Sequence, residues 1–285
     1  MINQVCIIGV GLIGGSLALA LKNAGFCQTI IGAGRNQQRL EKAQQLGIID
    51  SYSTSMADAV KDADIVFVAV PMGTMSAVFE QIAGHLKPGA VVTDGGSAKQ
   101  SVIDDAKQNL GDRFSNFVAG HPIAGTEKSG CEAAFAELYQ QRRIIITPTN
   151  ETNASAIDTV TAMWQAAGAE VETMAADLHD EVLAGTSHLP HLLAYGLVNC
   201  LFESDKADSY FKFAAGGFRD FTRIASSDPV MWRDICLTNK SALLDSLARY
   251  QTELDKLKSA LENNDGDQLL GDFQSAKKSR DKFHY

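Results

Sequence analysis

The spacing of hydrophobic residues changes at about residue 173 of the 285-residue chain. Before that point, short unbroken apolar runs alternate with segments in which apolar residues recur at helical spacing. A short unbroken run is typical of a strand buried on both faces, and its alternation with helices predicts parallel β-α-β units. We therefore predict a doubly wound parallel α/β sheet over residues 1–173. Its expected strands are residues 5–10, 29–35, 64–71, 90–97, 117–122 and 142–148.

Residues 174–285 show helical periodicity throughout and predict an all-α C-terminal domain. One segment carries large apolar residues at alternating steps of four and three, which is the spacing of helices that pack side by side. This stripe comprises Leu243, Leu247, Tyr250, Leu254, Leu257 and Leu261. The pattern fits packing inside one subunit, and it equally fits packing against a second subunit in a homodimer.

Composition and charge narrow the classes of partner. The net charge is −9 without any basic cluster, which argues against nucleic acid and against an anionic membrane surface. The apolar N-terminus lacks the basic start of a signal peptide, and no apolar run approaches the roughly 18 residues of a spanning helix. The five cysteines are scattered and form no C-x-x-C pair, which is typical of reduced thiols. We expect a soluble cytoplasmic protein.

The segment GVGLIGGS carries the glycine pattern of a dinucleotide site. Gly9, Gly11 and Gly14 follow the first predicted strand and begin a helix, which is the context that gives this pattern its meaning. The first glycine allows a tight turn, the second lets a pyrophosphate approach the backbone, and the third lets helix and strand pack closely. The N–H groups at the start of the helix, with Leu12 and Ile13, would face the phosphates. The N-terminal domain is therefore predicted to be of the Rossmann type.

The second predicted strand indicates NADP rather than NAD. An NAD site usually has an acidic residue about 20 positions after the glycine motif, where it holds the ribose 2′-hydroxyl. Here that count reaches Gly34 and Arg35, and no acid lies between Gly25 and Arg39. A guanidinium can hold a 2′-phosphate with paired N–H donors, and Asn36 could add a hydrogen bond. The alternative is that Arg35 is an ordinary solvated residue before the next helix.

Polar and turn residues occur at the ends of three of the predicted strands. They are Pro71-Met72-Gly73, then Asp94-Gly95-Gly96-Ser97, and then His121 in GHPIAGTEKSG. In doubly wound sheets, ligands bind beyond the carboxyl ends of the strands. We therefore expect Ser97 and His121 to converge near the nicotinamide, with Val70, Pro71 and Ser97 against the cofactor.

Three further histidines lie in the helical half. His188 and His191 are three residues apart in SHLPHLLA, and His179 lies nine residues before the first of them. No acidic or cysteine ligand stands at a recognisable spacing, so no metal site is predicted. These histidines either pack or cap within the protein, or they donate hydrogen bonds to a polar substrate.

Three segments together resemble the prephenate/arogenate (cyclohexadienyl) dehydrogenase family of tyrosine biosynthesis. They are GHPIAGTEKSG, SHLPHLLA and GGFRDFTRIASSDPVMWRDI, and the resemblance extends from Gly9 to roughly Lys240. It implies a nucleotide-binding domain, a helical domain that dimerises, and oxidative decarboxylation of prephenate or arogenate to 4-hydroxyphenylpyruvate or tyrosine. Many relatives have an acid after the second strand and use NAD, so the NADP prediction depends on Arg35 alone.

The resemblance also implies roles for individual residues. His121 would take the proton of the C4 hydroxyl, and Ser97 would orient this histidine or the hydroxyl. Arg223 would hold a substrate carboxylate, and His188 and His191 would line the pocket, with His191 in direct contact. Two residues that follow the catalytic histidine, Thr126 and Glu127, would shape the same pocket, although Thr126 could instead cap a helix. Of the neighbouring arginines, Arg233 is the one most easily explained as structural.

Two alternatives remain at this point. A β-hydroxyacid-dehydrogenase-like NADP oxidoreductase would share the domain order. Members of that family have a catalytic lysine on a helix of the second domain, and this chain has histidines there instead. A nucleotide-sensing protein without turnover would not need the serine, histidine and arginine together. The sequence does not choose between prephenate and arogenate.

Overall fold

The computed structural model describes residues 2–126 and 128–282 and has a six-stranded parallel sheet at its centre. The strand order is β3-β2-β1-β4-β5-β6, with all five pairings parallel. The glycine turn and the ends of β4 and β5 therefore lie at one edge of the sheet. The strands are β1 (Ile2–Ile8), β2 (Cys27–Ala33), β3 (Ser51–Ser53), β4 (Ile65–Val68), β5 (Val91–Asp94) and β6 (Phe117–Val118).

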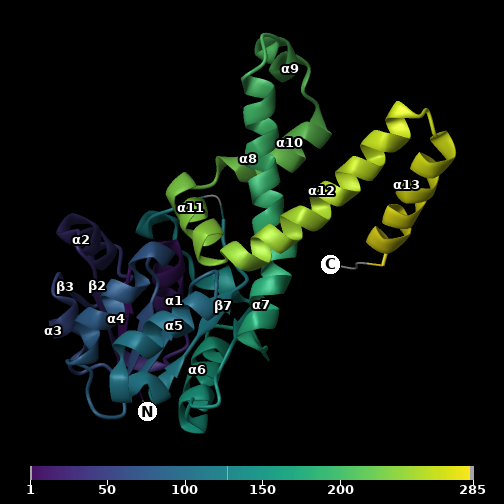
Figure 1. Cartoon of the computed structure of the whole chain (residues 1–285). Helices are drawn as coiled ribbons and strands as arrows, with labels where there is room; N and C mark the ends of the chain where they lie inside the picture. The colour runs from purple at the N-terminus through teal and green to yellow at the C-terminus, as the bar shows by residue number, and fades with distance from the viewer. Residues whose placement is uncertain (1, 127, 283–285) are drawn as a thin grey trace.

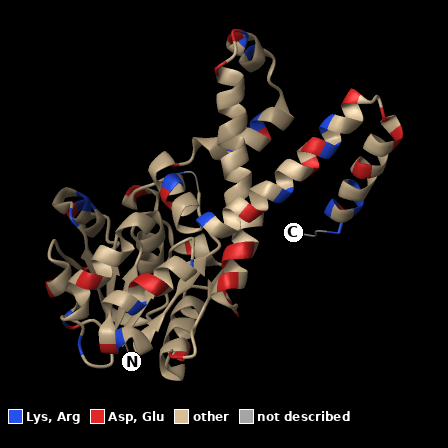
Figure 2. Ribbon diagram, viewed as in Figure 1, with Lys and Arg blue, Asp and Glu red and all other residues tan. Residues whose placement is uncertain are grey.

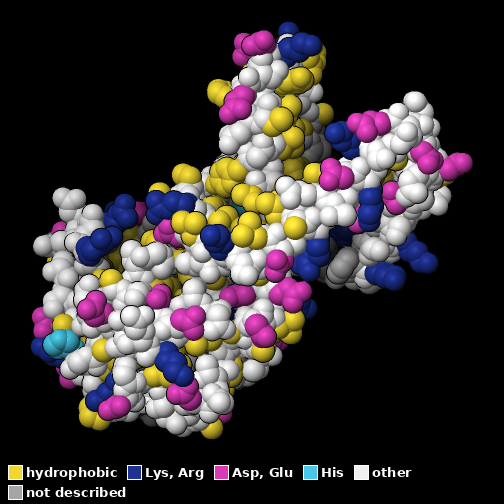
Figure 3. Space-filling view, in the orientation of Figure 1, with side chains coloured by type: hydrophobic (Ala, Val, Ile, Leu, Met, Phe, Trp, Pro, Cys, Tyr) yellow, Lys and Arg dark blue, Asp and Glu magenta, His cyan; other side chains and the backbone are white. Residues whose placement is uncertain are grey.

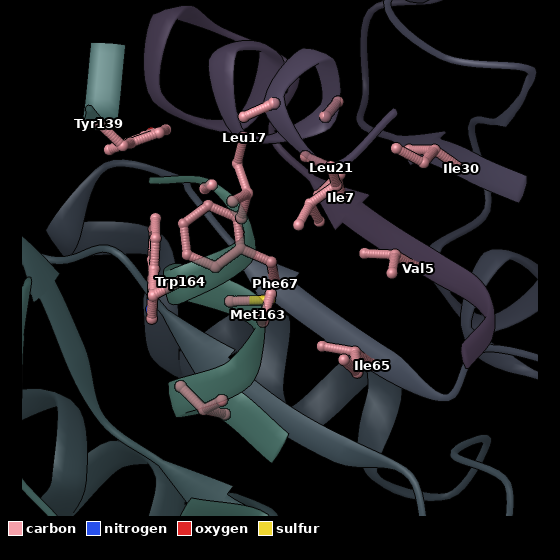
Figure 4. Packing of buried hydrophobic residues seen from close by; sticks show 14 of the residues in the cluster. Val5, Ile7, Leu17, Leu21, Ile30, Ile65, Phe67, Tyr139, Met163 and Trp164 are labelled. Carbon is pink, nitrogen blue, oxygen red and sulfur yellow. The ribbon is translucent and has the colours of Figure 1, made fainter. Parts of the chain in front are cut away.

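Helices cover both faces of this sheet, as the unbroken apolar strands predict. Residues alternate along β1: Val5 and Ile7 pack into one hydrophobic cluster, whereas Cys6 and Ile8 pack into the other. In the first cluster, Phe67 meets the edge of Trp164 at a centroid distance of 5.5 Å (Figure 4). The prediction of a doubly wound parallel sheet is confirmed. The helices are α1 (Leu12–Asn23), α2 (Gln37–Gln45), α3 (Met56–Val60), α4 (Met75–Ala83), α5 (Gln100–Asn109) and α6 (Ala154–Ala166).

Of the predicted strands, residues 142–148 do not join the parallel sheet, and residues 117–122 join it only through their first two residues. Residues 117–122 break into β6 and β7 (Gly120–Pro122), and β7 pairs antiparallel with β8 (Arg143–Ile146) in a separate sheet of order β7-β8-β9. The break occurs because the N–H of Gly120 donates to the Asp94 carboxylate at 3.0 Å instead of continuing the strand. The third strand of this sheet, β9 (Glu170–Thr173), has no clear apolar run and was not predicted.

Beyond Thr173 the described residues contain helices and turns but no strand. One column of helices and a second, hairpin-like pair project away from the α/β part (Figure 1). The helices are α7 (Ala176–Leu183), α8 (Leu189–Phe202), α9 (Ala207–Phe213), α10 (Gly216–Thr222), α11 (Pro229–Thr238), α12 (Lys240–Glu262) and α13 (Gly266–Arg280). A π-helical turn joins α7 to α8 (Ala184–His188), and short 3-10 turns are η1 (Met72–Thr74), η2 (Gly111–Asn116), η3 (Cys131–Ala133), η4 (Ala136–Tyr139) and η6 (Arg223–Ser226).

The projecting helices leave much apolar surface uncovered. The apolar stripe of α12 is split: Leu243 is buried, whereas Leu254 and Leu261 are exposed by 45% and 65%. α8 carries no charged residue and is unbroken tan in Figure 2. Apolar side chains crowd this column in Figure 3, and Phe202 and Phe213 are exposed by 69% and 77%. Within the described part of the chain, no helix is long and apolar enough to cross a membrane.

Candidate active site

The glycine turn between β1 and α1 has the shape that a dinucleotide phosphate requires. Gly9 has a φ of +94°, and a Cβ there would lie 2.4 Å from the main-chain oxygen of Ala69. A Cβ on Gly14 would lie 2.3 Å from the oxygen of Gly9. A Cβ on Gly11, in contrast, would meet nothing within 4 Å. Gly9 and Gly14 therefore allow close packing, and Gly11 leaves its backbone open to a ligand.

Helix α1 begins at this open backbone without a competing negative charge. Its N-cap residue is Gly11, no side chain caps it, and its first turn contains no acid. The N–H groups of Leu12 and Ile13 lie in that first turn, where they have no acceptor within the helix. Val70, after β4, packs against the glycine turn, and the exposed Pro71 follows it. These residues fit a dinucleotide with its phosphates at the start of α1.

The end of β2 presents two arginines to solvent. Arg35 and Asn36 are exposed, and together with Arg39 they line an open hollow. The Asn36 side chain accepts the N–H of Arg39 at 3.0 Å and so caps α2. Among the described residues, no acidic side chain forms an ion pair with Arg35. The sequence singled out Arg35 and Asn36 but did not identify Arg39.

His121 lies in the middle of β7, and a buried ion pair fixes the residue before it. Lys99 Nζ lies 2.5 Å from the Asp94 carboxylate and donates to the carbonyl oxygen of Gly120 at 2.7 Å. Both charged side chains are fully buried. The expectation that His121 ends a strand of the parallel sheet is wrong, because the chain leaves that sheet before Gly120. His121 nevertheless lies just beyond the end of β5.

A hydrogen-bonded series of buried side chains holds His121. Its Nδ1 lies 2.9 Å from His179 Nε2, and His179 Nδ1 lies 2.8 Å from the Asp180 carboxylate. Burial lowers the pKa of His121 well below its ordinary value, and the charges of His179, Lys99 and His188 lower it further. His121 is therefore neutral at pH 7. Within the described parts of the chain, its Nε2 makes no hydrogen bond.

His188 lies close to this series but is held by a different partner. Its Nδ1 lies 3.1 Å from Asn239 Nδ2, and the same amide nitrogen donates to the main-chain oxygen of Asp180 at 2.8 Å. The Nε2 atom of His188 is buried and has no hydrogen-bond partner among the described residues. Burial lowers the pKa of His188 to about 4, and the neighbouring histidines lower it while Asp180 opposes the shift.

His191 and Arg223 lie beside each other near the start of α8. The His191 ring stacks on Trp232 at a centroid distance of 3.6 Å, and its Nδ1 donates to the carbonyl oxygen of Ser187 at 2.9 Å. Burial lowers the pKa of His191, and the positive charge of Arg223 lowers it further, against the effect of the Ser187 bond. Arg223 is exposed, and no described acidic side chain pairs with it. Arg233, by contrast, donates to Asp234 at 2.6 and 2.8 Å, as a structural arginine would.

Ser97 and Thr126 make contacts other than those expected. Ser97 is half-buried and makes no described hydrogen bond to His121, whose Nδ1 instead lies 2.9 Å from His179 Nε2. The exposed Thr126 accepts the N–H of Lys128 in a local turn, and among the described residues that follow, the first helical turn is η3 rather than an α-helix that Thr126 could cap. Glu127 lies outside the described residues.

The contact between His179 and His121, and the role of Asp180, were not predicted from the sequence, although His179 was one of the candidate histidines. His179 and Asp180 are adjacent on α7, and their spacing to His121 follows no motif. The N–H groups of Lys99 and Gln100 donate to the Asp180 carboxylate at 2.7 and 2.9 Å, which brings α7 against the start of α5. No cluster of three or more metal-ligating side chains occurs in the described residues.

Family models match both halves of the chain. Residues 17–173 match the prephenate dehydrogenase nucleotide-binding domain, and residues 175–275 match the prephenate dehydrogenase dimerization domain. The chain belongs to the prephenate dehydrogenase family. The cyclohexadienyl dehydrogenase of Zymomonas mobilis is 39% identical to it over 98% of this chain and 95% of that protein.

Solved structures of the prephenate dehydrogenase family have the same fold over nearly the whole chain. The prephenate dehydrogenase of Aquifex aeolicus, in complex with hydroxyphenyl propionate and NAD⁺, is 38% identical with a TM-score of 0.92 over 98% of both chains. The arogenate dehydrogenase of Synechocystis is 28% identical with a TM-score of 0.83 over 99% of this chain and all of that one. The family thus includes proteins named for either substrate.

Proposed function

We propose that this protein catalyses the oxidative decarboxylation of prephenate, arogenate or both, with NADP as hydride acceptor. The observation that carries the proposal is the series His121–His179–Asp180. It places an imidazole that is neutral at pH 7 beyond the end of β5, at the edge of the sheet where the glycine turn also lies. A neutral imidazole with one unpaired ring nitrogen is suited to general-base catalysis. The products would be 4-hydroxyphenylpyruvate, tyrosine or both.

His121 would move one proton during the reaction. It takes the proton of the C4 hydroxyl as the C4–H bond breaks, and C4 becomes a carbonyl carbon. The bound nicotinamide supplies the hydride acceptor. The C1–carboxylate bond then breaks, its electron pair enters the ring, and CO₂ leaves. The ring becomes aromatic, and the C4 oxygen recovers the proton from His121, so that the residue returns to its neutral form.

The remaining residues would bind and orient the substrate. Arg223 would hold a carboxylate, because it is an exposed guanidinium beside the pocket histidines, and a bidentate pair would fix the ring face. His191 would contact the substrate directly, held in place by its stacking on Trp232. His188 would donate through its unpartnered Nε2. Ser97 would contact the C4 hydroxyl.

Two residues of the loop after His121 belong to the proposed site with less structural support. Thr126 is exposed and could reach a bound substrate. Glu127 is assigned by the resemblance of GHPIAGTEKSG alone.

Two rival functions have less support than the dehydrogenase. The lysine nearest the site, Lys99, is buried and paired with Asp94, so it does not fit the catalytic lysine of a β-hydroxyacid dehydrogenase. A sensor without turnover would not require the His121–His179–Asp180 series.

The protein is proposed to act as a homodimer through its C-terminal helices. Phe202, Phe213 and Leu261 expose large apolar side chains on the projecting helices. Exposed large apolar side chains on projecting helices are typical of an interface between subunits. The match of residues 175–275 to a dimerization domain supports the same assignment.

A four-way assay tests the proposed reaction. The purified protein is given prephenate or arogenate together with NAD or NADP, and reduced nicotinamide is followed by its absorbance. We expect turnover with at least one of the two substrates and a higher kcat/KM with NADP than with NAD. Absence of turnover with all four combinations would contradict the proposed function.

Replacement of Arg35 by alanine tests the cofactor assignment. Loss of a charge-assisted bond to the 2′-phosphate, at about 1.5–3 kcal/mol, lowers kcat/KM for NADP by roughly 10- to 100-fold and leaves NAD unaffected. The matched control is Arg143→Ala on β8, which removes an exposed arginine paired with Glu172 of β9. This variant should change kcat/KM for neither NADP nor NAD. An unchanged preference in Arg35→Ala would show that the arginine does not read the 2′ position.

A further inference from the structure

Asp180 joins two hydrogen-bonded series that end on two different histidines. Its carboxylate lies 2.8 Å from His179 Nδ1, and His179 continues to His121 Nδ1 at 2.9 Å. Its main-chain oxygen accepts from Asn239 Nδ2 at 2.8 Å, and Asn239 continues to His188 Nδ1 at 3.1 Å. All five residues are buried, so bulk water does not compete for these bonds. Asp180 is thus the common point of both series.

We propose that Asp180 sets the two histidines in opposite tautomers, with the His121 proton on Nδ1 and the His188 proton on Nε2. His121 then presents a lone pair at Nε2, whereas His188 presents an N–H donor at Nε2. The meaning of this difference depends on the proposed function: one imidazole accepts the C4 hydroxyl proton, and the other donates a hydrogen bond to a substrate oxygen. His179, Asp180 and Asn239 are positioning residues.

The tautomer of His121 follows from the carboxylate at the far end of its series. An ionised carboxylate only accepts hydrogen bonds, so His179 must carry its proton on Nδ1. When Nδ1 holds the single proton of His179, its Nε2 carries a lone pair, and His121 Nδ1 must donate to it. Burial raises the pKa of Asp180, but bonds from His179 and from the N–H groups of Lys99 and Gln100 outweigh it and lower that pKa, which keeps the carboxylate ionised.

The tautomer of His188 follows from the orientation of the Asn239 amide. The main-chain oxygen of Asp180 accepts only, so the atom that faces it must be the amide nitrogen. The second N–H of the same NH₂ group points to His188 Nδ1, which must accept. The proton of neutral His188 is therefore on Nε2, the buried nitrogen that has no partner among the described residues.

Both arguments require that the rings of His121 and His188 are neutral, and the surroundings of these two rings favour that form. The titratable groups that face His121 are His179, His188 and the Lys99 ammonium, which is paired with Asp94. Burial lowers the pKa of His121 well below its ordinary value and that of His188 to about 4. At pH 7 each ring carries a single proton, and the hydrogen bonds alone decide which nitrogen holds it.

Nitrogen NMR of the unmodified protein tests the proposal. The ligand-free enzyme is labelled with ¹⁵N-histidine, and long-range proton–nitrogen correlations at pH 7 report which ring nitrogen is protonated. Spectra of His121→Asn and His188→Asn assign the two rings. We expect a proton on Nδ1 of His121 and on Nε2 of His188. The reverse state for either ring, or a doubly protonated His179, would overturn the proposal.

Two variants separate the branches. His179→Phe removes the acceptor of His121, so only the His121 proton should no longer be fixed on Nδ1. Asn239→Leu removes the donor to His188, so only the His188 proton should no longer be fixed on Nε2. His85→Asn, on the exposed surface, is the matched control and should change neither ring. If either variant fails to fold, the spectrum of the unmodified protein still decides.

Kinetics then connect the tautomer to the reaction. Since general-base catalysis contributes roughly 10²–10⁴-fold, His179→Phe should lower kcat with either substrate by at least about tenfold and leave KM within about twofold. A change in KM alone, with kcat intact, would contradict the positioning role. The spectra need no substrate, so inactivity of the unmodified protein would refute the proposed function without touching the tautomers. Reversed tautomers in an active enzyme would refute only the role of Asp180.

Discussion

Replacement of His121 by asparagine is expected to lower kcat by roughly 10²–10⁴-fold, the usual contribution of a general base. Asparagine keeps a nitrogen that can donate to His179, but it has no group that can take the proton of the C4 hydroxyl. The Kd for NADP should stay within about twofold, because His121 belongs to β7 and the phosphates bind at the start of α1. Initial rates of nicotinamide reduction and a fluorescence titration with NADP measure the two quantities.

The control for this variant is a histidine that has no role in the proposed site. His85 is exposed after α4, and His85→Asn should leave both kcat and Kd unchanged. A loss of less than tenfold in His121→Asn would remove this histidine from the role of base. A weakened NADP complex would instead place it against the cofactor.

The pH dependence of the unmodified enzyme gives the same assignment independently. A histidine base is lost when it is protonated, so activity falls as the pH drops through its pKa. Because burial and neighbouring charges lower the pKa of His121, this fall in kcat/KM should occur well below pH 6.5, the ordinary value of a histidine. An acidic limb centred at or above pH 6.5 would show that another group titrates.

The parallel sheet could be predicted because its strands are buried on both faces. Val5 to Ile8 on β1 and Ile65 to Val68 on β4 form unbroken apolar runs, and such runs have few alternatives in a soluble protein. The same rule fails at residues 117–122. That run is also apolar, but a buried carboxylate from Asp94 captures the N–H of Gly120 and redirects the chain. A hydrogen bond between residues 26 positions apart leaves no periodic trace in the sequence.

Candidate site residues could be predicted from the sequence where they belong to one local motif. They could not be predicted where their role depends on the contact between two distant elements. The glycine spacing and the GHP sequence around His121 are local features that singled out these residues. His121 nevertheless lies on β7 and not at the end of a strand of the parallel sheet. His179 and Asp180 gain their importance only because α7 packs against the start of α5. The sequence HDE at residues 179–181 could be any exposed helix turn, so only a general packing, capping or substrate-binding role could be inferred for His179, and none for Asp180. Ser97 was assigned by the family resemblance to orient His121 or the substrate hydroxyl.

The glycine turn allows folding and cofactor binding to be separated by two variants of equal size. In Gly14→Ala the new methyl group would lie 2.3 Å from the main-chain oxygen of Gly9 and 2.7 Å from Ile7 Cγ2. Alanine gains up to about 1 kcal/mol over glycine in a helix, but a clash with backbone that cannot rotate away costs about 1–3 kcal/mol or more. We expect a net loss of stability and a lower unfolding midpoint without cofactor.

In Gly11→Ala the new methyl group meets nothing within 4 Å, and the φ of −105° suits alanine. The unfolding midpoint of the cofactor-free protein should therefore remain at its original value. The same methyl group stands where the pyrophosphate would approach the backbone, so the Kd for NADP should rise by about tenfold or more, equivalent to about 1.4 kcal/mol. Thermal unfolding without cofactor and NADP titration of both variants separate the two effects. An unchanged Kd in Gly11→Ala would mean that the dinucleotide does not cross this backbone, and the open space at Gly11 would then need another explanation.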